Sequence, residues 1–214
     1  MRQHSARSVR VVSIALVWAA LVWAAPLFAP AFAPVLAPAP ALAEDLKDMI
    51  YDPGQLKPVD STLKVRPGQL APDFALPAIS GQTVRLSDYR GKKNVVLSFV
   101  PAAFTPVCSD QWPGYKLTQE MFEERGAIIL GISVDNVPSL YAWVVEMHGL
   151  WFPVLSDFPH GAVAKRYGLL RTSGTSERAI VIIDKKGVIR FVKAFDINRR
   201  PDLGVIMGEL DKLQ

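Results

Sequence analysis

The chain has very few of the side chains that cross-link proteins or bind metals. Its 214 residues include one cysteine and three histidines. One cysteine cannot form an internal disulfide, so the fold must be stabilised by its apolar core alone. His148 and His160 are isolated from each other and from other metal-binding side chains, so we assign them no metal site.

The chain also lacks the excess positive charge of a nucleic-acid-binding protein. Its net charge is +4, but Arg2, Arg7 and Arg10 lie in an N-terminal stretch that contains no acid. The other 21 Lys and Arg residues (24 minus 3) are balanced by 20 acidic residues, all at or after Glu44. No basic stripe interleaved with aromatic residues occurs, so we expect no nucleic-acid binding.

The N-terminus has the pattern of an export signal. The three arginines precede residues 11–25, which are uncharged and apolar apart from one serine. Prolines recur through residues 26–40 and prevent a continuous helix there. The sequence Ala41-Leu42-Ala43 precedes Glu44 and predicts cleavage after Ala43.

An uncleaved membrane anchor is the alternative for the same segment. Residues 9–25 are close to the lower limit of about 17 residues for a spanning helix. The Pro/Ala tract would then form a semi-rigid stalk. In both cases we expect the remaining chain to be exported and to work in the periplasm or another extracytoplasmic space.

The chain is therefore divided into a signal or anchor at 1–43, an extension at 44–66 and one domain at 67–214. The extension is polar, contains Pro53, Gly54 and Pro58, and lacks sustained periodicity. This composition predicts a segment that lies over the domain or stays mobile. The remaining residues are enough for one domain and too few for two.

Apolar runs in the domain predict a mixed sheet. We expect two short strands with a turn at 74–77 and 83–86, and sheet strands at 95–100, 127–134, 179–183 and 188–192. The first two sheet strands are continuously apolar and flank a helix at 115–125, which indicates a parallel pair. The short turn at 184–187 indicates that the last two are antiparallel.

Further helices are predicted at 138–148, 162–167 and 202–213, the last with an amphipathic pattern. Together with the strands, they predict an α/β protein with a thioredoxin-like fold, in which helices flank a central mixed sheet.

Cys108 lies in the turn between the strand at 95–100 and a predicted helix start. A thiol there faces unpaired backbone N–H groups and the positive end of the helix dipole, which favour the thiolate. Free cysteines are also often buried as small hydrophobic residues. The flanking residues do not continue an apolar stripe, which argues against a core role and favours a reactive thiol; they include Thr105, Pro106, Ser109 and Asp110.

The pattern Pro101-x-x-x-Thr105-x-x-Cys108 resembles the active-site signature of the peroxiredoxins. Other segments resemble landmarks of that family in the family's order: residues 71–74, 86–89, 131–135, 152–157 and 178–184.

The spacing most resembles the peroxiredoxin Q, or bacterioferritin-comigratory, type, in which a resolving cysteine often lies five residues after the first. Pro113 occupies that position here, so the resemblance implies a one-cysteine variant. Pro113 and Gly114 also predict a short first helical turn followed by a separate helix.

The resemblance implies a thiol-dependent peroxidase that reduces hydrogen peroxide or organic hydroperoxides. Cys108 would become a sulfenic acid, and an external thiol would regenerate it. That thiol would come from a thioredoxin-like protein, a glutaredoxin-like protein or a small molecule. No cofactor is implied.

The resemblance also gives roles to three other residues. Arg178 would stabilise the thiolate and hold the peroxide oxygens, although its place at a strand end also fits a surface charge. Thr105 would hydrogen-bond the peroxide, cap the helix, or do both. Pro101 would shield the thiolate from water and fix the turn.

Two other functions of a thioredoxin-like fold fit the sequence less well. A thiol–disulfide exchange protein needs a Cys-x-x-Cys pair, whereas Gln111 stands three residues after Cys108. A copper-binding module would be expected to use two thiolates and a histidine, and this chain has a single thiol. Trp112 is expected to pack around the turn and to report on the thiol by fluorescence.

Overall fold

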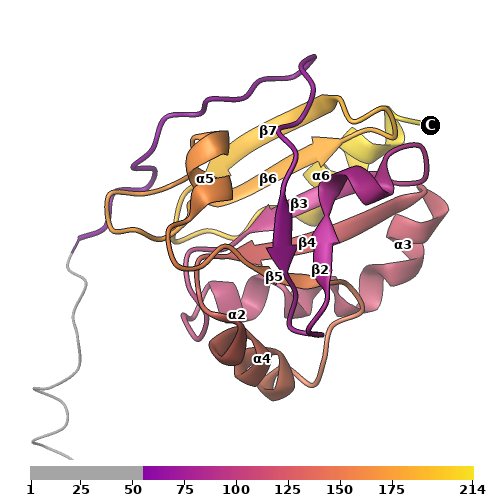
Figure 1. The fold of residues 1–214 in the computed structure, drawn as a ribbon. Coiled ribbons are helices and arrows are strands. Elements are labelled where there is room, and N and C mark those ends of the chain that lie inside the picture. The colour runs from indigo at the N-terminus through magenta and orange to yellow at the C-terminus, as the bar shows by residue number, and fades with distance from the viewer. Residues whose placement is uncertain (1–54) are drawn as a thin grey trace, which may run out of the picture. The chain divides into compact units, whose positions relative to one another are not determined.

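The computed structural model describes residues 55–214 (Figure 1). The predicted export segment and the first part of the extension, residues 44–54, lie outside the described residues. None of the helices within 55–214 combines the length and the apolar character that a bilayer-spanning helix requires.

A five-stranded mixed sheet forms the centre of the domain, with the strand order β5-β4-β3-β6-β7 (Figure 1). The central strand β3 pairs parallel with β4 and antiparallel with β6, and β6 pairs antiparallel with β7. These pairings confirm the predicted directions. The strands are β3 (Asn94–Phe99), β4 (Ala127–Ser133), β5 (Val154–Ser156), β6 (Arg178–Ile183) and β7 (Ile189–Phe195).

The edge strand β5 was not among the predicted sheet strands. It pairs parallel with β4 through only three residues and directly follows Pro153. Such a short segment contains no apolar run long enough to be recognised as a strand. The prediction of four sheet strands was therefore wrong by one edge strand.

The predicted pair of short strands is present as the separate hairpin of β1 (Ala75–Pro77) and β2 (Thr83–Arg85). A 3₁₀ helix, η1 (Leu86–Tyr89), follows it and buries Leu86.

Pro113 ends the first helical turn after the cysteine, as predicted. Helix α2 (Cys108–Gln111) is followed by the 3₁₀ helix η2 (Pro113–Thr118) and then by α3 (Gln119–Glu124). The prediction of an α-helix from residue 115 was therefore wrong over its first turn. The Thr118 hydroxyl donates to the carbonyl of Tyr115 at 2.7 Å, a local bond that competes with regular α-helical pairing.

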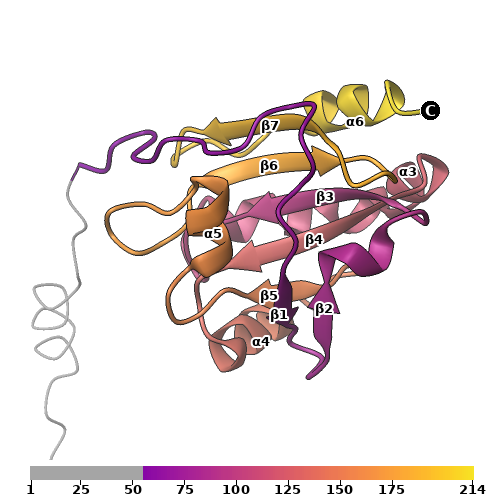
Figure 2. The same ribbon diagram turned by 45° about the horizontal axis from the view of Figure 1, so that its top comes forward.

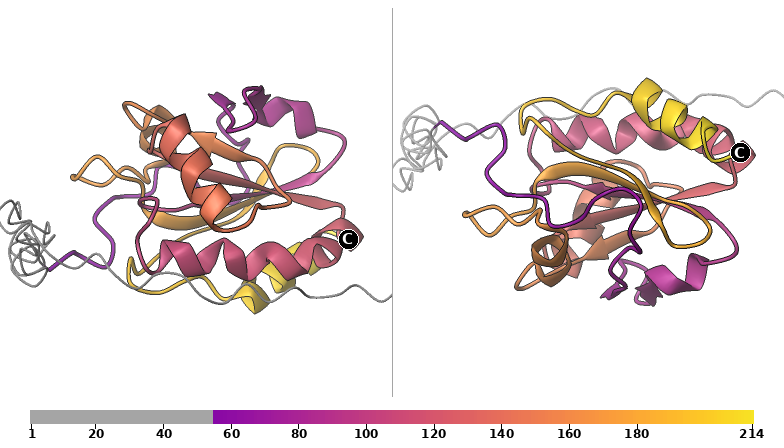
Figure 3. Two further views of the ribbon diagram at one scale, coloured as in Figure 1. Left: turned by 90° about the horizontal axis from the view of Figure 1, so that it is seen from below. Right: turned by 90° about the horizontal axis from the view of Figure 1, so that it is seen from above.

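The remaining helices are α4 (Val137–Glu146), α5 (Ala162–Tyr167) and α6 (Leu203–Asp211), close to their predicted positions. Figure 3 shows the sheet between two layers, with α3 and α6 on one side and α5 with the first hairpin on the other. Side chains from α2 and α4 pack into the same apolar cluster as α3 and α6. A Cβ on Gly131 of β4 would lie 2.9 Å from the Trp112 ring, so this packing requires glycine there.

Residues 57–65, which we call the strap, lie against the domain (Figure 2). Val65 is buried in the core, and the Lys64 amide donates to the carbonyl of Tyr167 at the end of α5, at 3.1 Å. Of the two alternatives for the extension, this part lies over the domain.

Candidate active site

Strand register brings Cys108 and Arg178 together. Phe99, at the end of β3, pairs with Ala179 in the antiparallel strand β6. Arg178 begins β6, so it lies beside the loop that leaves β3 and leads to α2. The guanidinium Nη2 of Arg178 donates to the Sγ of Cys108 at 3.2 Å. Two residues that are 70 positions apart in the sequence thus form a direct contact.

Cys108 is fully buried, which differs from the expectation that it lies outside the core. It belongs to the apolar cluster that includes Val100, Trp112 and Leu140. The reason is that Cys108, like Gln111, lies on the side of α2 that faces the interior. Helix α2 has only four residues, so the positive group nearest to the sulfur is the Arg178 guanidinium and not the end of a long helix dipole.

Arg178 is also buried, with 1% of its surface exposed, so the alternative of a surface charge is wrong. Its Nε and Nη2 donate to the carbonyl of Ile197 at 3.2 and 3.0 Å, and its Nη1 donates to Oε1 of Gln111. No ion pair among residues 55–214 includes Arg178. Its hydrogen-bonding partners are a backbone carbonyl, a side-chain amide oxygen and the sulfur.

The buried guanidinium of Arg178 needs polar or negative groups around it, and within residues 55–214 it forms no ion pair with a carboxylate. Burying an unpaired charge is costly, and a protein arginine does not lose its proton. The nearby Tyr115 cannot supply the anion, because burial raises its pKa to about 12. Among the groups hydrogen-bonded to Arg178, only the thiol can ionise, and a thiolate would complete the pair.

Gln111 is a site residue to which the sequence analysis gave no role. Its Nε2 donates to the hydroxyl of Ser98 at 3.0 Å, which directs its oxygen toward Arg178. The signal in the sequence is its spacing, since a residue three positions after Cys108 lies on the same side of a helical turn. A glutamine on the buried side of a helix needs polar partners, and β3 and β6 provide them.

Thr105 does not cap α2, so the capping alternative is wrong. The helix is preceded by Val107, and no side chain accepts a hydrogen bond there. The Thr105 hydroxyl donates to the carbonyl of Ala102 at 3.0 Å instead. Its oxygen keeps lone pairs that can accept a further hydrogen bond, and the residue is half-buried.

The loop that contains Pro101 is hydrogen-bonded to the segment before β6 and to the segment after β4. The carbonyl of Val100 accepts a hydrogen bond from the Ser176 hydroxyl at 2.7 Å. The amide of Ala103 donates to the carboxylate of Asp135, after β4, at 2.8 Å. Pro101 itself is buried at the start of this loop. Phe104 has a φ of 59°, a left-handed conformation that non-glycine residues seldom adopt.

Trp112 packs around the turn, as expected. Its ring centroid lies 5.0 Å from that of Trp143, and its Nε1 donates to the Ser98 hydroxyl at 3.1 Å. This hydroxyl also binds Gln111, so the indole is linked to the groups that surround the thiol. Within 55–214, no three His, Cys, Asp or Glu side chains gather in a geometry suited to a metal ion.

Comparisons with known proteins give a consistent result. The AhpC/TSA family matches residues 67–192. Alkyl hydroperoxide reductase E of Mycobacterium tuberculosis is 40% identical over 128 residues, covering 59% of this chain and 83% of that protein. Peroxiredoxin 2 of Caldanaerobacter subterraneus is 34% identical over 155 residues, covering 69% of each chain.

Solved structures show the same fold. The reduced 2-Cys peroxiredoxin of Plasmodium vivax aligns with a TM-score of 0.63 and 28% identity, over 67% of this chain and 79% of that one. AhpC of Mycobacterium tuberculosis aligns with a TM-score of 0.64 and 27% identity, over 70% and 93%. These relatives do not favour copper binding or thiol–disulfide exchange. The chain belongs to the AhpC/TSA peroxiredoxin family and is a thiol-dependent peroxidase.

Proposed function

We propose that Cys108 is the nucleophile of this peroxidase and that the chain works as a one-cysteine peroxiredoxin. The observation that carries the proposal is the 3.2 Å contact between Cys108 Sγ and a buried guanidinium that forms no carboxylate ion pair within 55–214. The thiolate is the attacking form of cysteine, and a free thiol with a pKa near 8.5 is mostly protonated at neutral pH.

In the reaction, the Cys108 thiolate attacks one peroxide oxygen. A sulfur–oxygen bond forms as the O–O bond breaks, and the leaving oxygen takes up a proton to become water or an alcohol. Arg178 is positioned to stabilise charge as it develops on the oxygens, and the Thr105 hydroxyl offers a further hydrogen bond. Pro101 restricts water around the sulfur. The product on the protein is Cys108 sulfenic acid.

An external thiol completes the cycle. It condenses with the sulfenic acid to give a mixed disulfide and water, and a second thiol releases reduced Cys108. These 214 residues contain no second cysteine, and Pro113 stands where the peroxiredoxin Q type often has one. Thioredoxin-like proteins, glutaredoxin-like proteins and small thiols are the candidate reductants. The relatives reported above carry alkyl hydroperoxide reductase E, peroxiredoxin 2 and 2-Cys names, so the peroxiredoxin Q assignment depends on this spacing.

Access to the sulfur is part of the proposal. Cys108 is fully buried, whereas Phe104 in the preceding loop is 53% exposed. We expect the loop around Phe104 to move aside when peroxide binds.

We further propose that the domain at 67–214 and its extension at 44–66 work outside the cytoplasm. The support is the basic, then apolar, then Pro/Ala-rich order of residues 1–43. N-terminal sequencing of the protein purified from a cell envelope would distinguish cleavage after Ala43 from a retained anchor.

Rapid mixing with hydrogen peroxide or an organic hydroperoxide tests the nucleophile. Trp112 packs in the cluster that contains Cys108, so its fluorescence should change as the sulfur is oxidised. Mass measurement should then find one added oxygen, and the Cys108→Ser variant should show neither signal. An undiminished rate of peroxide consumption in that variant would end the proposal.

A further inference from the structure

Three consecutive residues, Ser176 and Glu177 just before β6 and Arg178 at its start, make buried polar contacts with three parts of the molecule. The Ser176 hydroxyl bonds to the carbonyl of Val100 at the start of the Pro101 loop. Arg178 contacts Cys108. Between them, the carboxylate of Glu177 binds the strap. A displacement of this short segment would therefore change the geometry on both sides of the thiol.

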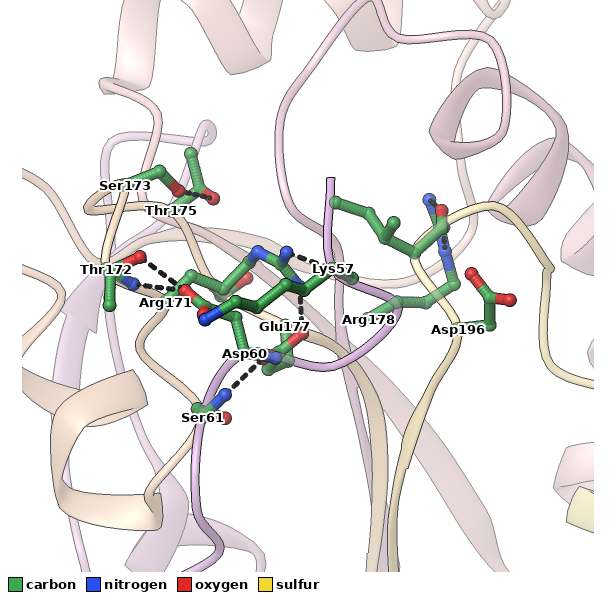
Figure 4. Close-up of polar contacts among 12 residues, drawn as sticks. Lys57, Asp60, Ser61, Arg171, Thr172, Ser173, Thr175, Glu177, Arg178 and Asp196 are labelled. Atoms are coloured by element: carbon green, nitrogen blue, oxygen red, sulfur yellow. Dashed lines mark hydrogen bonds and ion pairs between the residues drawn. The ribbon is translucent and has the colours of Figure 1, made fainter. Parts of the chain in front are cut away.

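The strap is bound by a fully buried carboxylate (Figure 4). Oε1 of Glu177 accepts hydrogen bonds from the amides of Asp60 and Ser61 at 2.6 and 2.8 Å. Oε2 forms an ion pair with Arg171 at 2.6 Å, and Arg171 also donates to the carbonyl of Lys57 at 2.8 Å. Every charge in this group is paired, so Glu177 and the strap hold each other in place.

A second connection runs through Ile197. Its amide donates to the carbonyl of Pro58 in the strap at 3.0 Å. Its own carbonyl accepts both hydrogen bonds from Nε and Nη2 of Arg178. Ile197 thus links the strap directly to the guanidinium. Arg178 is connected to the strap in two ways, through the Ile197 carbonyl that accepts its hydrogen bonds and through the adjacent residue Glu177.

Side chains of the strap also contact the residues around α5, and its backbone lies close to Gly168. The carboxylate of Asp60 accepts hydrogen bonds from the amide and hydroxyl of Thr172 at 2.8 and 2.5 Å, and the Ser61 hydroxyl donates to the carbonyl of Gly168 at 3.0 Å. Gly168 has a φ of 72°, and a Cβ there would overlap the strap backbone at Thr62 and Lys64. The close approach of the strap therefore requires glycine at this position.

We propose that the strap, residues 57–65, is a positioning element for the peroxidase reaction, holding Arg178 against Cys108 through Glu177 and Ile197. This inference rests on the proposed roles of Cys108 and Arg178. With the strap in place, the guanidinium is held on the sulfur. When the strap is displaced, the Ile197 carbonyl and the start of β6 lose one support each, and the thiolate loses its fixed partner.

Displacing the strap sterically is the first test. In the full chain, Gly168→Ala should push the strap away, and Gly149→Ala is the matched control. Gly149 also has a left-handed φ, of 83°, just after a helix, but a Cβ there would meet nothing within 4 Å. Both variants therefore carry similar backbone strain, and only one disturbs the strap.

Three quantities are measured on each variant: the rate with hydrogen peroxide, the pH midpoint of Cys108 alkylation and the denaturation midpoint. A shift of about 1 Å in a positioning group reduces rates on the order of a hundredfold. We expect Gly168→Ala to lower the peroxide rate by about tenfold to a hundredfold and to raise the alkylation midpoint. Gly149→Ala should lower only the denaturation midpoint. Equal effects of the two variants on rate and alkylation would overturn the inference.

A milder pair keeps the inference testable if Gly168→Ala does not fold. The double variant Asp60→Ala, Ser61→Ala removes side chains that bind Thr172 and Gly168 without touching the core. Its control, Asp211→Ala, removes an ion pair with Arg125 elsewhere on the surface. A slower peroxide rate and a raised alkylation midpoint in the strap variant alone would support the inference, and unchanged values would overturn it.

Failure of the proposed function gives a different result. If Cys108 is not the peroxidase nucleophile, the unaltered protein itself shows an ordinary alkylation midpoint and no fluorescence change with peroxide. If only the strap inference is wrong, the unaltered protein and the strap variants react equally fast.

Discussion

Two buried arginines near the start of β6 have opposite surroundings, although only seven positions separate them. Arg171 is 5% exposed and forms an ion pair with the buried carboxylate of Glu177. Arg178 is 1% exposed and hydrogen-bonds to a carbonyl, an amide oxygen and a sulfur. Figure 4 shows Arg171 among its partners and Arg178 apart from them.

The difference indicates that the charge of Arg171 stabilises the fold, whereas the charge of Arg178 takes part in the reaction. The charge of Arg171 is paired with the Glu177 carboxylate at 2.6 Å, so the pair has no charge left for a substrate. Arg178 forms no ion pair within residues 55–214 and contacts the Cys108 sulfur, and its positive charge is the feature that a peroxide reaction needs. The comparison therefore predicts that losing Arg171 mainly harms stability, whereas losing Arg178 mainly harms the reaction.

The largest expected change in stability follows Arg171→Gln. The variant leaves the Glu177 carboxylate buried without its cation, which costs about 3–5 kcal/mol of unfolding free energy. Urea denaturation measures the loss. Arg190→Gln is the control, because Arg190 pairs with Asp184 at a 43% exposed position, where such pairs contribute about 0–1 kcal/mol. Similar losses in both variants would contradict the structural role of Arg171.

Arg178→Gln should have the largest effect on the reaction. Removing a donor that stabilises developing charge reduces the rate by about a hundredfold to a thousandfold. Stopped-flow fluorescence with hydrogen peroxide measures this. Arg178→Gln should lose less unfolding free energy than Arg171→Gln. It removes a buried cation that forms no ion pair within residues 55–214, so no buried carboxylate is left without its partner. If Arg178→Gln keeps most of its peroxide rate but loses much of its unfolding free energy, Arg178 has a structural role and the proposed assignment is wrong.

The sequence predicts the parts of the molecule that depend on local pattern. Apolar runs and the turn at 184–187 predicted the four long strands and their directions, because buried strands and tight turns have local signatures. Proline chemistry predicted the end of α2 after one turn. The edge strand β5 and the 3₁₀ turn η2 were missed because each is set by tertiary contacts over very few residues.

The site was predictable only in part. The resemblance to peroxiredoxins suggested Cys108 with Arg178, but the burial of both depends on how β3, α2 and β6 assemble. The contacts of Glu177 with Asp60 join residues 117 positions apart. No periodicity or spacing rule predicts such pairs, so Gln111, Arg171 and Glu177 were found only in the structure.

Gln111→Ala tests whether Gln111 positions Arg178, because it removes one neutral hydrogen-bond acceptor of the guanidinium. A buried donor left without an acceptor costs about 1–3 kcal/mol, and the guanidinium is then free to turn from the sulfur. We expect the peroxide rate to fall by about tenfold, the change that 1.4 kcal/mol produces. The control is Gln119→Ala, since Gln119 lies on the surface and bonds only to Glu123. Equal rates in the two variants would show that Gln111 does not position Arg178.

The smallest expected effect is on the pH dependence of stability. It depends on Asp60 in the strap, whose amide binds Glu177, the ion-pair partner of Arg171. Hydrogen bonds from Thr172 lower the pKa of Asp60 from 3.8 to about 2. A lowered carboxyl pKa contributes stability that is fully present above the unfolded value and is lost as pH falls through the folded value. The stability difference between the protein and Asp60→Asn should therefore be constant above about pH 5 and shrink toward pH 2. Denaturation at several pH values measures it, and a difference that grows on acidification would contradict this contact.

The central claim is that Cys108, held against Arg178, is the atom that peroxide oxidises. Mass measurement at short times after mixing with one equivalent of hydrogen peroxide tests it most directly. We predict one added oxygen located on Cys108 in the unaltered protein, formed much more slowly in Arg178→Gln. An oxygen found on another residue, or formed equally fast in the two proteins, would contradict the claim.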